Sequence, residues 1–163
     1  MPFIASLDAV NRTTATVGNG HCVKLVQALL PAIGTTPMWR PGAAVASGLA
    51  AGTAIATFVK GKYENDAIHH RSHAAIYLRH VGTNIEVFDQ YIGKAPSKRT
   101  IGARGADNCT TPKGNPKFCF WTNDADRYFV IEQVGAGAPP SPTSTPTSAP
   151  TSTPAATPRP SPR

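Results

Sequence analysis

The chain has 163 residues and a formal net charge of +7, with 16 lysines and arginines against 9 aspartates and glutamates. This length accommodates one globular domain with a substantial core and excludes two full ones. The charge favours anionic partners such as nucleic acid, anionic lipid or acidic cell-wall polymers. Because the basic residues are spread over several segments without interleaved aromatics, we expect a solvated basic surface and no nucleic-acid partner.

The N-terminal residues 1–8 contain neither a basic leader nor the apolar core of a secretory signal peptide. No apolar run approaches the roughly 18 to 20 residues that cross a bilayer, so we expect no membrane span. We expect a monomer that is cytoplasmic before any export, and any export route would be one without an N-terminal signal peptide.

Apolar residues recur at helical spacing directly after Cys22. They are Val23, Val26, Leu29 and Leu30. This spacing predicts one buried helix over residues 22–30, which Pro31 ends because its ring cannot continue an established helix. Asn19 or Gly20 is positioned to cap the helix at its N-terminus.

Strand-like runs rich in β-branched and aromatic residues follow the helix. They cover residues 53–58, 74–78, 85–89 and 128–132, after a turn-rich stretch around residues 39–42. One early helix followed by several antiparallel strands indicates an α+β domain.

From Gly135 onward the composition changes to proline, serine, threonine and alanine, with no aromatic and no acidic residue. Such a segment cannot bury enough apolar area to offset its ordering entropy, which predicts a disordered tail over residues 135–163. The folded domain is therefore expected to span residues 1–134.

Two further cysteines, Cys109 and Cys119, flank a turn-rich segment. Their spacing is compatible with a short disulfide loop that leaves Cys22 unpaired. Three reduced thiols are equally compatible with a chain that shows no export signal.

A cysteine at the N-terminus of a helix has a lowered thiol pKa, because the helix dipole and unpaired backbone N–H groups stabilise the thiolate. Cys22 occupies such a position, and the glycines on either side of Asn19 allow a sharp turn and a close approach of substrate. Taken alone, the spacing favours the interpretation of Cys22 as a small buried hydrophobe.

Three histidines, His69, His70 and His73, crowd into five residues. Because adjacent residues of an extended chain point in opposite directions, this segment does not predict a metal site. His73 directly precedes a strand, which places its side chain on the face of Tyr77. If Tyr77 lies opposite Ile85, a turn forms around residues 80–82.

In that register Asp89 lies directly across from His73. A slip of one residue would bring Gln90 there instead. Either side chain could hydrogen-bond to the imidazole, but only the Asp89 carboxylate would also stabilise an imidazolium. Cys22, His73 and Asp89 then form a nucleophile, a base and an orienting acid.

At these residues the chain resembles the NlpC and CHAP group of papain-like peptidoglycan amidases, and most closely its small members without a leader, which resemble the type VI secretion amidase effectors. The resemblance rests on Gly20-His21-Cys22-Val23, residues 52–58, Ser72 to Tyr77, Val87 to Tyr91 and Asn123 to Asp126. It implies a papain-like fold in which the helix bearing the cysteine packs on an antiparallel sheet.

The resemblance also implies cysteine-dependent hydrolysis of an amide bond in the stem peptide or cross-link of peptidoglycan, without a cofactor. Cys22 would attack the carbonyl, His73 would act as base and then acid, and Asp89 would orient His73. Gly20 and His21 would contribute to the oxyanion site, although His21 stands where the group commonly has glutamine. The expected location is the cell wall or periplasm, with a secretion or immunity partner left open.

Two other functions remain compatible with these residues. One is a catalytically silent module that binds the cell wall, and the other is a cysteine protease or acyltransferase that acts on a substrate outside the wall.

Overall fold

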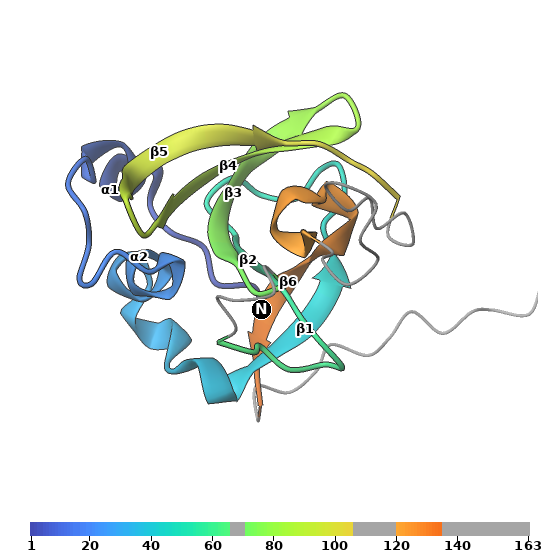
Figure 1. Ribbon diagram of the computed structural model, residues 1–163, viewed down its shortest axis with the longest axis horizontal. Coiled ribbons are helices and arrows are strands. Elements are labelled where there is room, and N and C mark those ends of the chain that lie inside the picture. Colours follow the sequence, from blue (N-terminus) through green and yellow to red (C-terminus); the bar gives the residue numbers. More distant parts are fainter. Residues whose placement is uncertain (66–70, 106–119, 135–163) are drawn as a thin grey trace, which may run out of the picture.

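The computed structural model describes residues 1–65, 71–105 and 120–134. Their framework is a six-stranded antiparallel sheet in the order β1-β6-β2-β3-β4-β5 (Figure 1). The strands are β1 (Trp39–Ala44), β2 (Ala54–Thr57), β3 (Ala74–Val81), β4 (Asn84–Tyr91), β5 (Lys94–Ile101) and β6 (Tyr128–Gln133). The helices are α1 (Leu7–Arg12) and α2 (Cys22–Leu29), with short 3-10 helices η1 (Pro31–Ile33), η2 (Thr36–Met38), η4 (Trp121–Asn123) and η5 (Ala125–Arg127). The predicted α+β class is confirmed.

The sheet separates two apolar clusters because successive side chains of a strand point to opposite faces. On one face α2 buries Leu25 and Val26 against side chains that include Ile76 of β3. On the other face Tyr77 packs in a second cluster with Tyr128. Strand β3 thus contributes to both clusters, which is why its first residues are buried without alternation. Among the described residues, no helix is both long and apolar enough to cross a bilayer.

Helix α2 begins at Cys22, as predicted, and ends one residue before the predicted Leu30. The residue at the N-cap is His21, whose side chain makes no capping hydrogen bond, so the expectation that Asn19 or Gly20 would cap the helix is wrong. Asn19 instead accepts a hydrogen bond from the backbone N–H of His21 through Oδ1. The sulfur of Cys22 therefore lies at the first helical position.

Strands β1 and β5 are the elements that the sequence patterns missed, together with the short helix α1. Both strands are edges of the sheet. An edge strand tolerates proline, and β1 contains Pro41 in the stretch described as turn-rich. An edge also carries charged side chains that discourage further pairing, and β5 contains Lys94, Lys98 and Arg99. These features mask the alternation typical of a strand.

The predicted register between β3 and β4 is wrong by two residues. Tyr77 lies opposite Val87, and not opposite Ile85, which pairs with His80 beyond an irregularity in the ladder. The connecting turn follows Val81, so it lies later than predicted. On the His73 side of the irregularity the shift is two residues, which leaves each side chain on its predicted face. Asp89 therefore lies diagonally across from His73 and remains within reach of it.

Candidate functional site

The sulfur of Cys22 lies at the N-terminal end of α2, half-buried at the edge of the core on the α2 face of the sheet. Burial by itself raises the thiol pKa. Hydrogen bonding to His73, the positive charge of that ring, the Tyr63 hydroxyl and the backbone N–H of Ala74 outweigh burial and lower the pKa of Cys22 to about 7. The surroundings of this sulfur thus favour the thiolate.

His73 precedes β3 directly, and its ring is buried with one nitrogen bound to a carboxylate. The distance from His73 Nε2 to Asp89 Oδ2 is 2.7 Å. Burial lowers the pKa of the ring, but hydrogen bonds to Asp89 and Cys22 and the negative charges of both groups raise it to about 9. Nε2 therefore faces the carboxylate, and Nδ1 is the nitrogen left to serve the sulfur.

Asp89 has no exposed surface, and its Oδ2 accepts a second hydrogen bond that the sequence did not indicate. Arg99 Nε donates to the same Oδ2 at 2.6 Å. Burial raises the pKa of Asp89, yet the hydrogen bond and charge of His73 together with Arg99 hold it below its ordinary value. The carboxylate is thus ionised when it binds the imidazole.

Arg99 joins this carboxylate to the segment that precedes β6. Its Nη1 donates to Asn123 Oδ1 at 3.0 Å and its Nη2 to the carbonyl of Thr122 at 3.3 Å. The sequence analysis included Arg99 among the residues of a solvated basic surface, but its side chain is only 20% exposed. For Arg99 that interpretation is wrong, because Arg99 and Asp89 come from strands whose adjacency the sequence pattern did not indicate.

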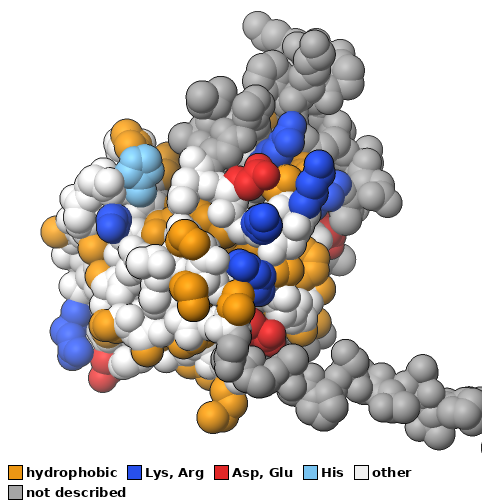
Figure 2. Space-filling model, turned by 90° about the horizontal axis from the view of Figure 1, so that it is seen from below, with side chains coloured by type: hydrophobic (Ala, Val, Ile, Leu, Met, Phe, Trp, Pro, Cys, Tyr) orange, Lys and Arg blue, Asp and Glu red, His pale blue; other side chains and the backbone are white. Residues whose placement is uncertain are grey.

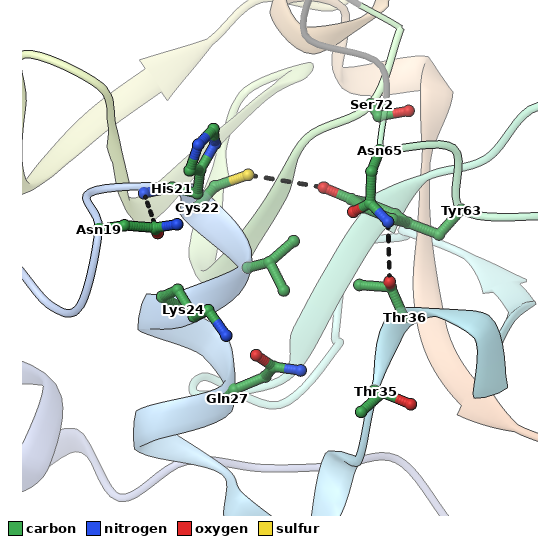
Figure 3. A pocket seen from close by; sticks show the side chains of 11 residues that line it. Asn19, His21, Cys22, Lys24, Gln27, Thr35, Thr36, Tyr63, Asn65 and Ser72 are labelled. Atoms are coloured by element: carbon green, nitrogen blue, oxygen red, sulfur yellow. Dashed lines mark hydrogen bonds between the residues drawn. The ribbon is translucent and has the colours of Figure 1, made fainter.

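Tyr63 is the second residue that the sequence patterns missed. Its hydroxyl oxygen lies 3.5 Å from Cys22 Sγ (Figure 3). Burial and the nearby thiolate raise its pKa well above the ordinary value, so the hydroxyl keeps its proton and donates to the sulfur. The ring is held edge-on against Trp39, with centroids 5.2 Å apart. No periodic pattern surrounds Tyr63 that would have identified it.

Two cavities meet at Cys22. One, of about 400 Å³, lies between α2 and the segment containing Tyr63, as Figure 3 shows. The other, of about 520 Å³, extends past His73 toward Arg99 and Asn123. His21, Cys22 and Ser72 line both cavities. The sulfur thus lies at the junction of a cleft that can hold a chain on both sides of a reacting bond.

Gly20 and His21 directly precede Cys22, and of the two His21 is the one that lines the cavities. Gly20 is buried with φ of +82°, a left-handed conformation that favours glycine. His21 is exposed and lines both cavities. Gln90, the alternative partner for His73, does not approach that ring. Its side chain bonds to the backbone of Val17 and His21 instead, because consecutive strand residues point to opposite faces.

Within the described part of the chain, no group of three His, Cys, Asp or Glu side chains is placed to hold a metal ion. His69 and His70 lie outside the described residues. The same holds for Cys109 and Cys119, so their pairing stays a prediction.

The two pKa values leave Cys22 as thiolate and His73 as imidazolium between pH of about 7 and about 9. A thiolate is the nucleophilic form of cysteine, and an imidazolium beside it can give a proton to a leaving group. The first residue of a helix also has a backbone N–H without a partner inside the helix. Such an arrangement can perform acyl transfer.

Comparison with known proteins assigns relatives to this chain. Residues 6–131 match the family described as Domesticated amidase effector 2. A type VI secretion amidase effector 2 protein of Salmonella typhi is 34% identical over 139 residues, which cover 81% of this chain and 100% of that protein. A solved structure of type 6 secretion amidase effector 2 (Tae2) has a TM-score of 0.65 at 32% identity, covering 82% of this chain and 96% of that one. Cys22, His73 and Asp89 all lie within the matched residues.

Proposed function

This chain belongs to the Domesticated amidase effector 2 family, and from that premise we propose that it hydrolyses an amide bond of bacterial peptidoglycan through a thioester on Cys22. As a member of that family it is an amidase, and the resemblance of its fold to papain-like enzymes is confirmed. The observation that carries the mechanism is the arrangement of Cys22 beside His73, whose other nitrogen binds the buried Asp89.

In the first half of the reaction, the Cys22 thiolate attacks the amide carbonyl carbon and a C–S bond forms. The carbonyl oxygen becomes an oxyanion, for which the backbone N–H of Cys22 is the proposed donor. The His73 imidazolium then protonates the amide nitrogen, the C–N bond breaks and the amine leaves. The acyl group remains on the sulfur as a thioester.

In the second half, neutral His73 removes a proton from water, and the resulting hydroxide attacks the thioester carbonyl. The C–S bond breaks, which releases a carboxylic acid and regenerates the thiolate beside an imidazolium. Asp89 is the proposed orienting acid in both halves, because it holds Nε2 and stabilises the positive ring. Arg99 keeps that carboxylate ionised.

The His21 ring is the side chain that the sequence resemblance proposes as a second oxyanion donor. Its position on the rim of both cavities is compatible with that role. The Tyr63 hydroxyl is another polar group near the sulfur, at 3.5 Å from it. Gly20, two residues before Cys22, stays a proposed part of the oxyanion site, and its φ of +82° belongs to the turn that leads into α2.

The charge of the chain supports a wall substrate. The net charge is +7, and Figure 2 shows Lys and Arg side chains over several parts of the face drawn. A basic protein is attracted to acidic wall polymers and to the carboxylates of stem peptides. We propose action in the periplasm after type VI delivery, since relatives are named as secretion effectors. A cognate immunity protein and a monomeric state belong to the same proposal.

The proposed function is tested by incubating purified protein with peptidoglycan sacculi and analysing the released muropeptides by mass spectrometry. We expect the parent to release fragments with a new amine and a new carboxylate, and Cys22→Ala to release none. Arg79→Gln is a matched control, because it removes an exposed ion pair with Glu86 and leaves the cleft intact. Equal release by the parent and Cys22→Ala would overturn the proposal. Retention on sacculi without any cleavage would favour the silent binding module.

A further inference from the structure

Strand β4 places two buried polar side chains next to each other in sequence, Asp89 and Gln90, and both have no exposed surface. Consecutive strand residues point to opposite faces of the sheet. Asp89 reaches His73 on one side, whereas Gln90 reaches the loop that precedes α2 on the other. The proposed mechanism uses the first of these residues and assigns nothing to the second.

The amide of Gln90 makes three hydrogen bonds to backbone, which use both of its N–H groups and its oxygen. Its Oε1 accepts from the N–H of Val17 at 2.9 Å. Its Nε2 donates to the carbonyl of Val17 at 2.8 Å and to the carbonyl of His21 at 2.9 Å. One oxygen facing an N–H and one nitrogen facing two carbonyls define the orientation of the amide without ambiguity. A buried amide bound in this way holds the loop from Val17 to His21 against the sheet.

The bond to His21 has a particular consequence for Cys22. The carbonyl of His21 and the N–H of Cys22 belong to one planar peptide group, in which they point in opposite directions. Any group that fixes the carbonyl therefore also fixes the direction of the N–H. That N–H lacks a partner within the helix, because Cys22 is the first residue of α2.

The loop itself needs such an anchor. It contains Gly18 and Gly20, both with positive φ. Two further described hydrogen bonds, from Gly20 N to the carbonyl of Val17 and from His21 N to Asn19 Oδ1, run within the loop and do not tie it to the sheet. Glycine has more backbone freedom than other residues. Without Gln90, the peptide that joins His21 to Cys22 would be held only by the first turn of α2.

We propose that Gln90 is a positioning residue that aims the Cys22 N–H at the developing oxyanion. The inference rests on the proposed function, since it assumes acyl transfer at Cys22. Two successive residues of β4 then position the two halves of the chemistry: Asp89 orients the base, and Gln90 orients the oxyanion donor. Gln90 acts through backbone alone and does not contact the sulfur or the imidazole in any described hydrogen bond.

If Gln90 has this role, its replacement should affect two reactions of the Cys22 sulfur differently. Acylation by p-nitrophenyl acetate passes through an oxyanion: the thiolate attacks the carbonyl, a C–S bond forms and p-nitrophenolate leaves. Alkylation by iodoacetamide forms a C–S bond at a methylene carbon and releases iodide, with no oxyanion. A residue that orients an oxyanion donor affects only the first reaction, whereas a residue that affects the thiolate or the fold changes both.

The experiment compares both rates at Cys22 in the full chain, with the rates of Cys22→Ala subtracted to remove the other cysteines. Gln90→Met removes all three hydrogen bonds at similar volume. Gln90→Glu keeps the acceptor for Val17 N–H and loses the amide donor. Gln133→Met is the matched control, because its Nε2 also donates to a backbone carbonyl, that of Ala32 in η1, and Gln133 lines neither cavity.

For the Gln90 variants we expect acylation to slow by about 10- to 100-fold, less than the roughly 10²- to 10³-fold that complete loss of an oxyanion donor produces, because the N–H is misdirected and not removed. Alkylation should stay within about 3-fold of the parent and keep its pH profile, and Gln133→Met should change neither rate. If Gln90→Met does not fold, as judged by urea unfolding, Gln90→Glu decides. Unchanged acylation, or an equal loss of both rates, would overturn the proposal. Neither reagent is a wall fragment. A failure of this inference can therefore be distinguished from a failure of the proposed function, which would appear as an inability to digest sacculi.

Discussion

His73 and Asp89 are joined by a 2.7 Å hydrogen bond from Nε2 to Oδ2, in a place where the carboxylate has no exposed surface. A buried carboxylate beside an imidazole stabilises the positive form of the ring. The positive ring in turn stabilises the thiolate of Cys22. The reactivity of the Cys22 sulfur thus depends on Asp89, which acts on it through His73.

Asp89→Asn should therefore lower the pKa of His73 and raise that of Cys22. The amide keeps the shape of the carboxylate but carries no charge, and it favours the wrong ring tautomer. We expect alkylation of Cys22 at pH 7 to slow and its midpoint to move to higher pH, and amide hydrolysis to fall by about 10²- to 10⁴-fold. Glu86→Gln is the control, a half-buried carboxylate on the same strand that pairs with the exposed Arg79. An unchanged pH profile of Cys22 alkylation in Asp89→Asn would contradict the dependence of the Cys22 pKa on Asp89.

The rate of hydrolysis should follow a bell-shaped pH profile. The acid limb reports thiolate formation at the Cys22 pKa of about 7, and the alkaline limb reports loss of the imidazolium proton at the His73 pKa of about 9. Measurement of kcat/KM from pH 5 to 10 on a soluble wall peptide tests this expectation. A rate that continues to rise beyond pH 9.5 would exclude His73 as the proton donor.

Cys22→Ala should make stability depend on pH where the parent does not. On folding, Cys22 loses a proton between pH of about 7 and its ordinary 9.0, and His73 gains one between its ordinary 6.5 and about 9. In the parent the two changes cancel between pH 7 and 9. A raised histidine pKa alone stabilises the fold fully below pH 6.5, and this stability is lost as pH rises through the folded pKa.

The variant should accordingly lose about 1.4 kcal/mol of unfolding free energy per pH unit above pH 6.5, until the folded pKa of His73 is reached. Without the thiolate that pKa lies below about 9, because Cys22 contributes to raising it. Urea unfolding at half-unit steps of pH measures the slope. The double variant Cys22→Ala/His73→Gln should remove it, and a parent with the same slope as Cys22→Ala would refute the pairing.

Arg99→Met should raise the pKa of Asp89 and loosen the contact between β5 and residues 122–123. Its three hydrogen bonds are lost together, and Asp89 keeps only His73 as a partner. We expect the fold to lose about 1 to 3 kcal/mol of unfolding free energy, because a charged group loses buried partners. Lys98→Met is the matched control, since Lys98 is adjacent on β5 and exposed. Equal urea midpoints for both variants would contradict the prediction.

Tyr63→Phe should raise the pKa of Cys22 while preserving the fold. The hydroxyl donates to the sulfur, whereas the ring packs edge-on against Trp39 and Phe58 and stays in place. We expect alkylation at pH 6 to slow by about 10-fold, since a hydrogen bond to a charged group contributes about 1.5 to 3 kcal/mol and a contact of 3.5 Å to sulfur belongs at the lower end of that range. Comparison of alkylation rates from pH 5 to 9 tests the direction of the shift.

Local patterns in the sequence predicted the elements that face the core. The helix from Cys22 is indicated by its apolar spacing and by Pro31, and the strands around His73 and Asp89 by their apolar residues. The edge strands β1 and β5 escaped prediction, because their prolines and charged residues serve to limit pairing and do not form an alternating pattern.

By itself the sequence determined the order of Cys22, His73 and Asp89 and the face on which each strand residue lies, because both follow from residue types and a period of two along a strand. Only the tertiary structure decided the partners across strands: Asp89 with Arg99, Cys22 with Tyr63, and Gln90 with the loop before α2. The physical reason is that register depends on turns and irregularities of the ladder. At the end of β3 near His73, a shift of two residues relative to β4 preserves the faces but changes which side chains meet.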